Sequence, residues 1–303
     1  MNFSRIKTRA EIILYGHILN WPWRSHQERR DARGAVTEKA VSRYLERYAP
    51  FIADIREDIT EKEASGQERI FSIWLQGEKN APGIVQASLK SIRHNCTQEL
   101  VVLDEKSISE WISLPGYIMD KWKSGKIRPA HFADICRVEL LYRYGGIWLD
   151  ATCFVTSPIP RWITDEDFFI YLGGNTLKGS YAFVQNCFFR SRKGDLLVKV
   201  WREAISAYWA AENSAIDYFV HQLLFKMAVL NNPQAKGRFD RMPHMEQDPT
   251  HALWLEYRDR PFDRETYDRV TAGAFFQKTE YKSGSARQPA TGSFSDIMQK
   301  MYK

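Results

Sequence analysis

The residues best suited to chemistry in this sequence lie in one stretch, residues 131–152, which reads HFADICRVELLYRYGGIWLDAT. Asp134 and Arg137 are three positions apart in a segment with helical spacing, so their side chains share one side of a helix. Asp150 follows a short apolar run, residues 147–149, that is typical of a buried strand. Because ligands of open α/β sheets bind beyond the carboxyl ends of the strands, a carboxylate there is a candidate site residue.

A simpler interpretation of the same residues is also open. Asp134 and Arg137 could form an ion pair on a helix surface, which stabilises a helix by only about 0.2–0.5 kcal/mol. Asp150 could simply begin a loop. Spacing alone does not separate the two interpretations.

The elements that must position these residues can be predicted from the surrounding pattern. Pro129 suits the first turn of a helix, and Gly145 suits its left-handed end. Upstream, residues 70–75 and the segment ELVVLDEKS at 99–107 are short apolar strands, and residues 81–95 between them have helical spacing. A strand, a helix and a strand in this order predict a right-handed parallel crossover and an open, mostly parallel α/β sheet.

The downstream half is expected to complete this sheet and to add helices. Residues 168–172 and 181–190 have the pattern of strands, and residues 196–211 and 216–230 have the apolar periodicity of long helices. These helices should pack beside the sheet and form one wall of a cleft.

Three regions are expected along the chain. We expect a helical lead-in over residues 1–66 and a central α/β domain over residues 67–283, with a helical annex at about 195–260. Residues 284–303 are expected to be a loosely held tail that could end in one short helix. Within the annex, residues 231–249 are rich in Asn, Pro and charge, which predicts a flexible loop.

Composition limits the classes of protein that fit. The chain has 303 residues, 44% hydrophobic and 14% aromatic, enough for a sizeable core. A net charge of +6 and a pI near 9.0 predict attraction to nucleotide phosphates, lipid headgroups or nucleic acid, although an ordinary basic surface would explain them equally well. Because the basic residues are interspersed with acidic ones, nucleic acid is not the expected partner.

The cysteines indicate a reducing location. Cys96, Cys136, Cys153 and Cys187 include no CxxC pair, so neither a zinc site nor a disulfide framework is expected. We therefore expect a cytoplasmic protein.

The N-terminal segment begins with basic residues and continues with apolar and aromatic ones. No run reaches the roughly 18 apolar residues of a membrane span, and Tyr15, Gly16 and His17 interrupt the apolar part too early for a good signal peptide. Two interpretations are open: a helix in a membrane interface, with Trp21 and Trp23 as anchors, or a helix that covers the domain's own core. The first would place the protein peripherally on the inner face of the membrane.

The stretch HFADICRVELLYRYGGIWLDAT resembles the signature of sugar transferases with a DxD motif, a group that includes initiating mannosyltransferases and the glucosyltransferase domain of clostridial toxins. Its wording GGIWLDAT is most similar to the capsular polysaccharide synthesis proteins. The segments IWLQGEKNAPGIVQASLKSIRHN, AIDYFVHQLLF and QKTEYK also resemble that family, so the resemblance spans residues 70–282.

The resemblance implies a GT-A type fold and a glycosyltransferase. Such an enzyme moves a sugar, with retention of configuration, from a nucleotide-diphosphate sugar to a glycan or lipid-linked acceptor in capsule or other surface polysaccharide synthesis. It gives catalytic roles to Asp134, Arg137 and Asp150, which also bind the donor. The other implied donor residues are Trp74, Gln76, Gly146, Lys278 and Lys282. Asp217 and His221 are candidates for the acceptor side, although the simpler interpretation of His221 is a packed or surface histidine.

The sequence departs from the DxD pattern at Thr152, where many relatives have a second Asp. In such enzymes the two acids bind a divalent cation, Mn²⁺ or Mg²⁺, that neutralises the leaving diphosphate. A hydroxyl carries no charge, so a metal bound by Asp150 and Thr152 should be held weakly. A nearby acid, Asp217 or one of residues 165–167, could complete its ligands.

With a weak metal site, side-chain cations would share the charge of the diphosphate. Lys278 and Lys282 are the candidates, because a leaving oxyanion is stabilised by preorganised positive charge. A catalytically silent member that binds nucleotide-sugar or glycan as an assembly partner is the alternative to an enzyme. A nucleic-acid-binding protein is a further alternative, motivated only by the basic pI.

Overall fold

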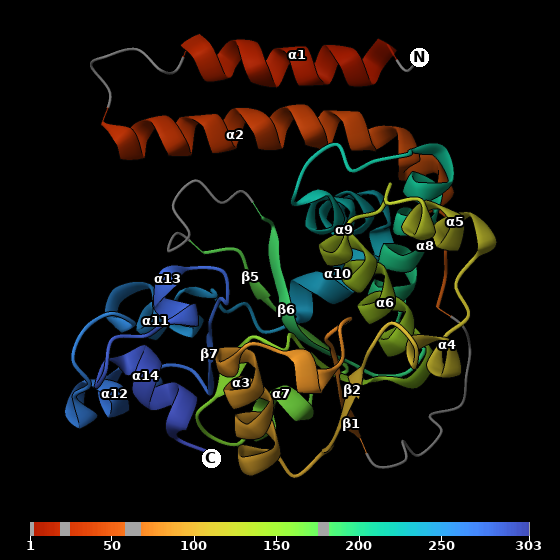
Figure 1. Cartoon of the computed structure of the whole chain (residues 1–303). Coiled ribbons are helices and arrows are strands. Elements are labelled where there is room, and N and C mark those ends of the chain that lie inside the picture. The colour runs from red at the N-terminus through yellow and green to blue at the C-terminus, as the bar shows by residue number, and fades with distance from the viewer. Residues whose placement is uncertain (1–2, 19–24, 58–67, 175–181, 303) are drawn as a thin grey trace.

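A five-stranded sheet lies at the centre of the molecule (Figure 1). The computed structural model describes residues 3–18, 25–57, 68–174 and 182–302. The strands, in the spatial order β2-β1-β3-β6-β5, are β1 (Arg69–Ile73), β2 (Glu99–Leu103), β3 (Gly146–Leu149), β5 (Phe168–Leu172) and β6 (Val184–Ser191). β1 runs parallel to β2 and β3, whereas β6 is antiparallel to β3 and β5. The predicted α/β class is confirmed, and the sheet is mixed.

The helix α3 (Gly83–Asn95) connects β1 to β2, as the predicted crossover requires. Pro82 is its N-cap, and Ile84, Leu89 and Ile92 on one face are fully buried. Burying each such side chain contributes about 1.5–3 kcal/mol, so packing holds this helix on the sheet.

The helix α6 (Pro129–Tyr144) leads directly into β3 and sets where that strand begins and ends. Pro129 is at its first turn, and Gly145 follows it with a φ of 68°, a left-handed value that favours glycine. A Cβ at Gly145 would lie 2.6 Å from the backbone nitrogen of Lys193. α6 packs against β1, β3 and β6, and both Asp134 and Arg137 belong to its buried side.

Three further helices follow in the chain; the first packs on α6, and the other two pack on the first. α8 (Leu196–Ala211) has the predicted bounds, whereas α9 (Val220–Asn231) begins four residues later than predicted. The flexible loop predicted at 231–249 is wrong in its first half, which forms α10 (Pro233–Arg241). Asn232 caps this helix by accepting a hydrogen bond from Ala235 N, and Phe239 is buried, so the Asn-Pro pair begins a helix here.

The C-terminal part adds a second, two-stranded antiparallel sheet of β4 (Cys153–Val155) and β7 (Phe276–Lys278). The expected tail includes α13 (Gly284–Arg287) and α14 (Phe294–Lys300), and α14 packs on α3. Phe294 and Met298 are buried, and the side chain of Ser293 caps the helix. This apolar face holds the segment to the domain.

Two long helices form the N-terminal layer, with α1 (Phe3–Ile18) on the outside and α2 (His26–Leu45) beneath it (Figure 1). Ser25 and Glu28 form a capping box that begins α2, and α2 packs on α9. Trp21 and Trp23, the expected aromatic anchors, lie outside the described residues. No helix in the part of the chain that the structure describes is long and apolar enough to cross a membrane.

The remaining elements are short, and the core is aromatic. Trp148, Trp201, Trp209 and Trp254 are among its largest buried side chains. The short elements are η1 (Glu46–Phe51), η2 (Glu78–Asn80), α4 (Ile108–Trp111), α5 (Gly116–Lys123), α7 (Arg161–Thr164), η3 (Asp248–Thr250), α11 (Ala252–Tyr257) and α12 (Arg264–Thr271).

Candidate functional site

Asp134, Arg137 and Asp150 meet at the carboxyl end of β3. Arg137 Nη2 lies 3.1 Å from Asp134 Oδ1 and 3.3 Å from Asp150 Oδ1. The side chains of Arg137 and Asp134 are only 6% and 10% exposed, whereas that of Asp150 is 22% exposed. The pair on α6 is therefore not a surface ion pair, because it is buried and shared with a third charge.

The end of β3 orients the Asp150 carboxylate. Its backbone N–H donates to Cys187 O on β6 at 2.8 Å, which holds the residue at the sheet edge. Trp148, two residues earlier, donates its indole N–H to Asp150 Oδ1 at 2.8 Å. The Arg137 guanidinium lies over the Trp148 ring, 4.8 Å from its centre. One tryptophan thus supports both the carboxylate and its cationic partner.

Lys278 reaches the same place from a distant part of the chain. β7 pairs with β4 so that Lys278 is opposite Cys153, next to Thr152. Its ammonium lies 3.1 Å from Asp150 Oδ2 and also donates a hydrogen bond to Thr152 Oγ1. The resulting group, Asp134, Arg137, Asp150 and Lys278, is called the charged cluster below.

Mutual attraction keeps Asp150 and Lys278 of the charged cluster ionised. Burial opposes ionisation of Asp150, but Lys278 and Arg137 outweigh it and hold the pKa of Asp150 below its ordinary value. Burial likewise opposes the charge of Lys278, but Asp150 raises the Lys278 pKa well above its ordinary value. Asp134 differs, because burial raises its pKa in spite of Arg137.

Two amides that the sequence pattern did not indicate extend the charged cluster. Asn186 on β6 donates to Asp134 Oδ1 at 2.9 Å and accepts from Arg137 Nη1 through its backbone carbonyl. Gln222 on α9 donates to Asn186 Oδ1 at 3.2 Å. The sequence signal for Asn186 is a polar residue within the largely apolar strand VQNCFF. The signal for Gln222 is its place in the segment AIDYFVHQLLF, which resembles the family.

His221, expected on the acceptor side, lies behind Asp134. Its Nδ1 is 3.8 Å from Asp134 Oδ2, and its Nε2 accepts a hydrogen bond from Trp209 Nε1 at 3.1 Å. The ring is fully buried and stacks on His131 at 5.5 Å. Burial, together with the neighbouring His131 and Arg137, lowers the pKa of His221 well below its ordinary value, so this histidine is neutral and supports the cluster from inside.

Other expected donor residues are not part of the charged cluster. Trp74 follows β1, and its ring meets the Tyr281 ring edge-on at 5.0 Å. The Trp74 indole N–H is buried and has no hydrogen-bond partner among the described residues. Gln76 and Lys282 are exposed, and the Lys282 ammonium lies over the Tyr281 ring.

Gly146 and Asp217 have local structural roles. Gly146 begins β3, at the opposite end of the strand from Asp150, with a φ of 98°. Asp217 precedes α9 and accepts a hydrogen bond from Phe219 N at 2.8 Å.

The residues present do not suit a divalent cation. Asp150 Oδ1 is held by Trp148 and Arg137, while Asp150 Oδ2 and Thr152 Oγ1 both bind the Lys278 ammonium. Among the described residues no group of three or more His, Cys, Asp or Glu side chains is arranged to hold a metal. An ammonium therefore occupies the position between the two expected metal ligands.

The acids considered as further ligands lie elsewhere. Asp165 pairs with Arg161 and Asp167 with Arg192, and their side chains are 64% and 51% exposed. They form a solvated turn before β5.

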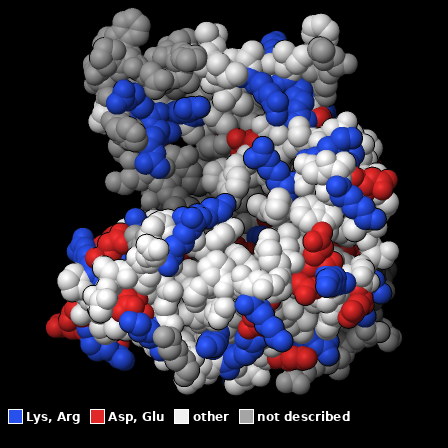
Figure 2. Space-filling model, in the orientation of Figure 1, with Lys and Arg blue, Asp and Glu red and all other residues white. Residues whose placement is uncertain are grey.

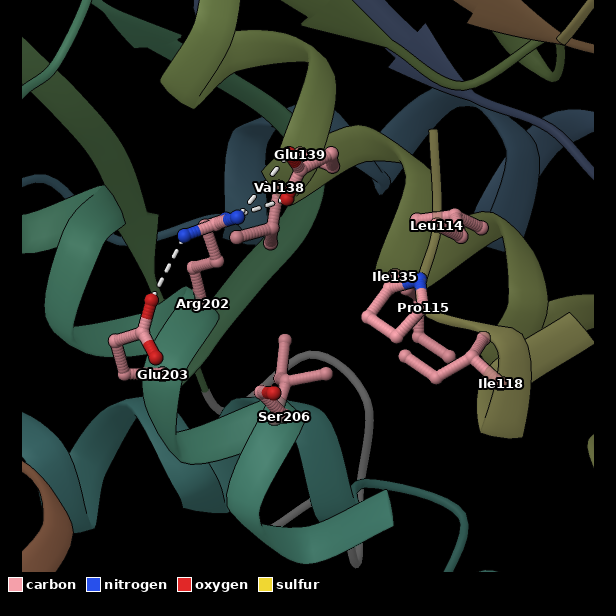
Figure 3. A pocket seen from close by; sticks show the side chains of 10 residues that line it. Leu114, Pro115, Ile118, Ile135, Val138, Glu139, Arg202, Glu203 and Ser206 are labelled. Atoms are coloured by element: carbon pink, nitrogen blue, oxygen red, sulfur yellow. Dashed lines mark hydrogen bonds and ion pairs between the residues drawn. The ribbon is translucent and has the colours of Figure 1, made fainter. Parts of the chain in front are cut away.

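Two hollows lie away from the charged cluster. The first, about 140 Å³ between α5, α6 and α8, has its polar lining satisfied by the pairing of Arg202 with Glu139 and Glu203 (Figure 3). The second, about 400 Å³, lies beside α12 and includes Trp162 and Tyr171. No residue of the charged cluster lines either hollow, and the first is smaller than ordinary ligand pockets.

The fold and the charged cluster define an α/β protein with an ionised group of side chains at the carboxyl end of a central strand. The sequence matches the family described as capsular polysaccharide synthesis protein over residues 22–297, and the chain belongs to that family.

Three relatives carry names that describe an activity. The chain is 25% identical over 197 residues to "Glycosyltransferase afumC" of Aspergillus fumigatus, covering 60% of this chain and 50% of that protein. It is 22% identical over 190 residues to "O-glycosyltransferase braB" of Annulohypoxylon truncatum, covering 57% and 45%. It is 25% identical over 128 residues to "O-glycosyltransferase PaGT" of Phomopsis amygdali, covering 39% and 30%. The chain thus spans half or less of the length of these relatives.

Proposed function

We propose that this protein is a cytoplasmic glycosyltransferase with a GT-A type fold. It transfers a sugar, with retention of configuration, from a nucleotide-diphosphate sugar to a hydroxyl group of a glycan or lipid-linked acceptor in capsule or other surface polysaccharide synthesis. The observation that carries the proposal is the buried charged cluster at the carboxyl end of β3. Membership of the capsular polysaccharide synthesis family and the glycosyltransferase names of the relatives support it.

The proposed reaction needs binding of hydroxyls and stabilisation of a departing anion. The bond between the anomeric carbon of the sugar and the diphosphate oxygen breaks, the acceptor oxygen bonds to that carbon, and the acceptor's proton passes to the diphosphate. Asp134 and Asp150 are ionisable acceptors for sugar hydroxyls, and Arg137 holds both carboxylates in place. Most of the rate enhancement would come from positioning and from fixed charges.

Lys278 is the group that we assign to the charge of the leaving diphosphate. It is protonated, partly exposed and already directed at the expected metal position. The divalent metal that the resemblance implies would have to displace this ammonium from both Asp150 and Thr152. The resident cation therefore takes the role of neutralising the diphosphate in this proposal.

Trp74 is the residue that we assign to the nucleotide. It offers an aromatic surface and an indole N–H that has no hydrogen-bond partner among the described residues. A buried donor without a partner is unfavourable, so an acceptor on the base or ribose would relieve that cost.

A donor screen tests the proposed function. We expect a uridine or guanosine diphosphosugar to raise the melting temperature, because a ligand of the native state stabilises it. We expect Asp150→Ala to abolish the shift and Asp165→Ala, at an exposed acid outside the cluster, to keep it. Absence of any shift with the wild-type protein across the panel, with and without Mn²⁺, would contradict the proposal.

The second candidate function is a catalytically silent protein that binds nucleotide-sugar or glycan. One observation favours it. Lys278 neutralises Asp150 and Thr152 stands in place of a second acid, so the site has less charge for metal-assisted catalysis. Donor binding without hydrolysis or transfer, over a panel of donors and acceptors, would favour this candidate over the enzyme.

A further inference from the structure

The outer face of α1 is apolar, although it faces away from the rest of the molecule. Phe3, Ile6, Ile13 and Leu14 are 84%, 47%, 60% and 59% exposed. At the 100° that each residue turns in a helix, these four and the exposed Ala10 fall in an arc of roughly 100°. A helix in a folded domain ordinarily turns such a stripe inward.

The opposite face of α1 holds the helix firmly on the body of the protein. Arg5 pairs with the buried Glu212 at the end of α8 and donates to Ser214 O at 2.6 Å. Arg47 donates to Ser4 Oγ, and Thr8 is buried. The apolar arc is therefore fixed in an outward direction by contacts on the other side of the same helix.

Basic residues border the apolar arc. On the helical projection, Lys7 lies at one edge and Arg9 at the other, and both are exposed. α1 and α2 together carry eight Lys and Arg against four Asp and Glu, a large part of the net charge of +6. Figure 2 shows basic side chains along this layer, with fewer acidic ones than over the lower part of the same face.

We propose that α1 docks this protein on the surface of an anionic lipid bilayer, with the apolar arc in the headgroup region. An apolar stripe bordered by Lys and Arg is the pattern of a helix that lies in a membrane interface. Each basic residue near an anionic surface strengthens binding, and the exposed apolar side chains add burial. Docking of this kind needs no spanning helix.

Charge decides between a bilayer and a second copy of the chain. In a two-fold dimer the same patch would face itself, so Lys7 and Arg9 of one copy would approach those of the other. Like charges repel across such an interface, whereas an anionic bilayer attracts them. The surface therefore fits lipid better than it fits its own copy.

Vesicle flotation of the full chain tests this proposal without donor, acceptor or turnover, so its outcome is independent of the proposed function. The probes are phosphatidylcholine vesicles with and without about one third phosphatidylglycerol. We expect the wild-type protein to float with the anionic vesicles only, and to be released by added salt because salt screens the attraction.

Substitutions in the arc make the test specific. We expect Ile6→Asn with Ile13→Asn to weaken binding to anionic vesicles by about tenfold or more, because two exposed apolar side chains are lost. Leu255→Asn is the matched control, since Leu255 is 39% exposed on α11, away from α1 (Figure 1). Far-ultraviolet circular dichroism checks that all variants fold.

Two results would overturn the proposal. One is equal flotation of the wild-type protein and the Ile6/Ile13 variant. The other is a wild-type dimer, seen by light scattering, that the same variant dissociates while neither protein binds vesicles.

Discussion

Asp150 joins two cations that come from different parts of the chain, and its charge should make the stability of the protein depend on pH. Lys278 and Arg137 hold its pKa in the folded protein below its ordinary value against the cost of burial. Since an unfolded Asp titrates near pH 3.9, the contribution of Asp150 is present above about pH 4 and is lost as the pH falls through the lower, folded pKa.

The measurement is the melting temperature of the wild-type protein and of Asp150→Asn between acidic and neutral pH. We expect a large gap at neutral pH, because removing one partner of a buried ion pair costs about 3–5 kcal/mol. The gap should close in acid, and comparison with the variant removes the contributions of other carboxyls such as Asp134. A gap that stays constant over the whole range would show that the charge of Asp150 is not what stabilises the fold.

Lys278 should matter much more than its neighbour Lys282. We expect Lys278→Gln to lower turnover by about 100-fold or more, the usual effect of removing one group that stabilises a developing anion. Mn²⁺ should stimulate this variant more than the wild-type enzyme, because Asp150 Oδ2 and Thr152 Oγ1 lose the ammonium that binds them.

Lys282→Gln is the matched control, since Lys282 is exposed and its ammonium lies over the neighbouring Tyr281 ring. Steady-state kinetics with and without Mn²⁺ or a chelator distinguish the two lysines. Equal activities of both variants would remove Lys278 from the chemistry.

The sequence was informative about site residues wherever the geometry is local. Asp134 and Arg137 lie on one helix and Asp150 follows the next strand, so helical spacing and strand ends were enough to place them together. The contact of Lys278 with Asp150 depends on the register of β4 and β7, more than a hundred residues apart, and only the family resemblance indicated it. Asn186 was not predicted because its partners belong to two other elements, α6 and α9.

At the scale of elements, the turn from α6 into β3 decides whether the cluster can form. Gly146 has a φ of 98°, and a Cβ there would lie 2.5 Å from the carbonyl oxygen of Arg69 on β1. We expect Gly146→Ala to lower the free energy of unfolding by about 1–3 kcal/mol or more, from backbone strain together with the clash.

Urea denaturation measures this loss, and Gly116→Ala is the control. Gly116 opens α5 with no atom near the added Cβ, so the alanine should be neutral or slightly stabilising. An unchanged stability of Gly146→Ala, with a loss confined to donor affinity, would instead support the role in donor binding that the resemblance implied.

Helices and strands with a continuous apolar pattern were predicted well. Helices that begin directly after Asn, Pro, Gly or Ser were predicted less well. α8 and β5 have the predicted bounds because their apolar pattern is continuous. α10 and α14 were predicted as loop and tail because Asn, Pro, Gly and Ser dominate the residues before them. Those residues are the caps of the two helices, and each helix needs only one or two buried aromatic or apolar side chains to stay in place.

At the scale of the whole molecule, one buried carboxylate links both helices of the N-terminal layer to the α/β domain. Glu212, at the end of α8, accepts hydrogen bonds from Arg5 on α1 and from Tyr44 and Tyr48 on α2 and η1. Burial and this carboxylate raise the pKa of Tyr44 to about 12, so both tyrosines remain donors over the working range of pH. The composition predicted a helical lead-in, but only the fold shows which residue anchors it.

Glu212→Gln should therefore loosen the N-terminal layer while leaving the sheet intact. Without the negative charge, Arg5 is left in a largely buried position beside a neutral amide, and losing one partner of such a pair costs about 3–5 kcal/mol. Hydrogen exchange should speed up in α1 and η1, while β1 and β3 keep their protection. It should also speed up in the segment 212–219, which Arg5 and Arg9 hold through the backbone carbonyls of Ser214 and Ala215.

Glu11→Gln is the control, because its pair with Arg43 is solvent-exposed and contributes at most about 1 kcal/mol. If both variants exchange alike, Glu212 does not anchor the layer; if the sheet loosens together with α1, the two parts unfold as one unit and the outward-facing arc of α1 is as stable as the core.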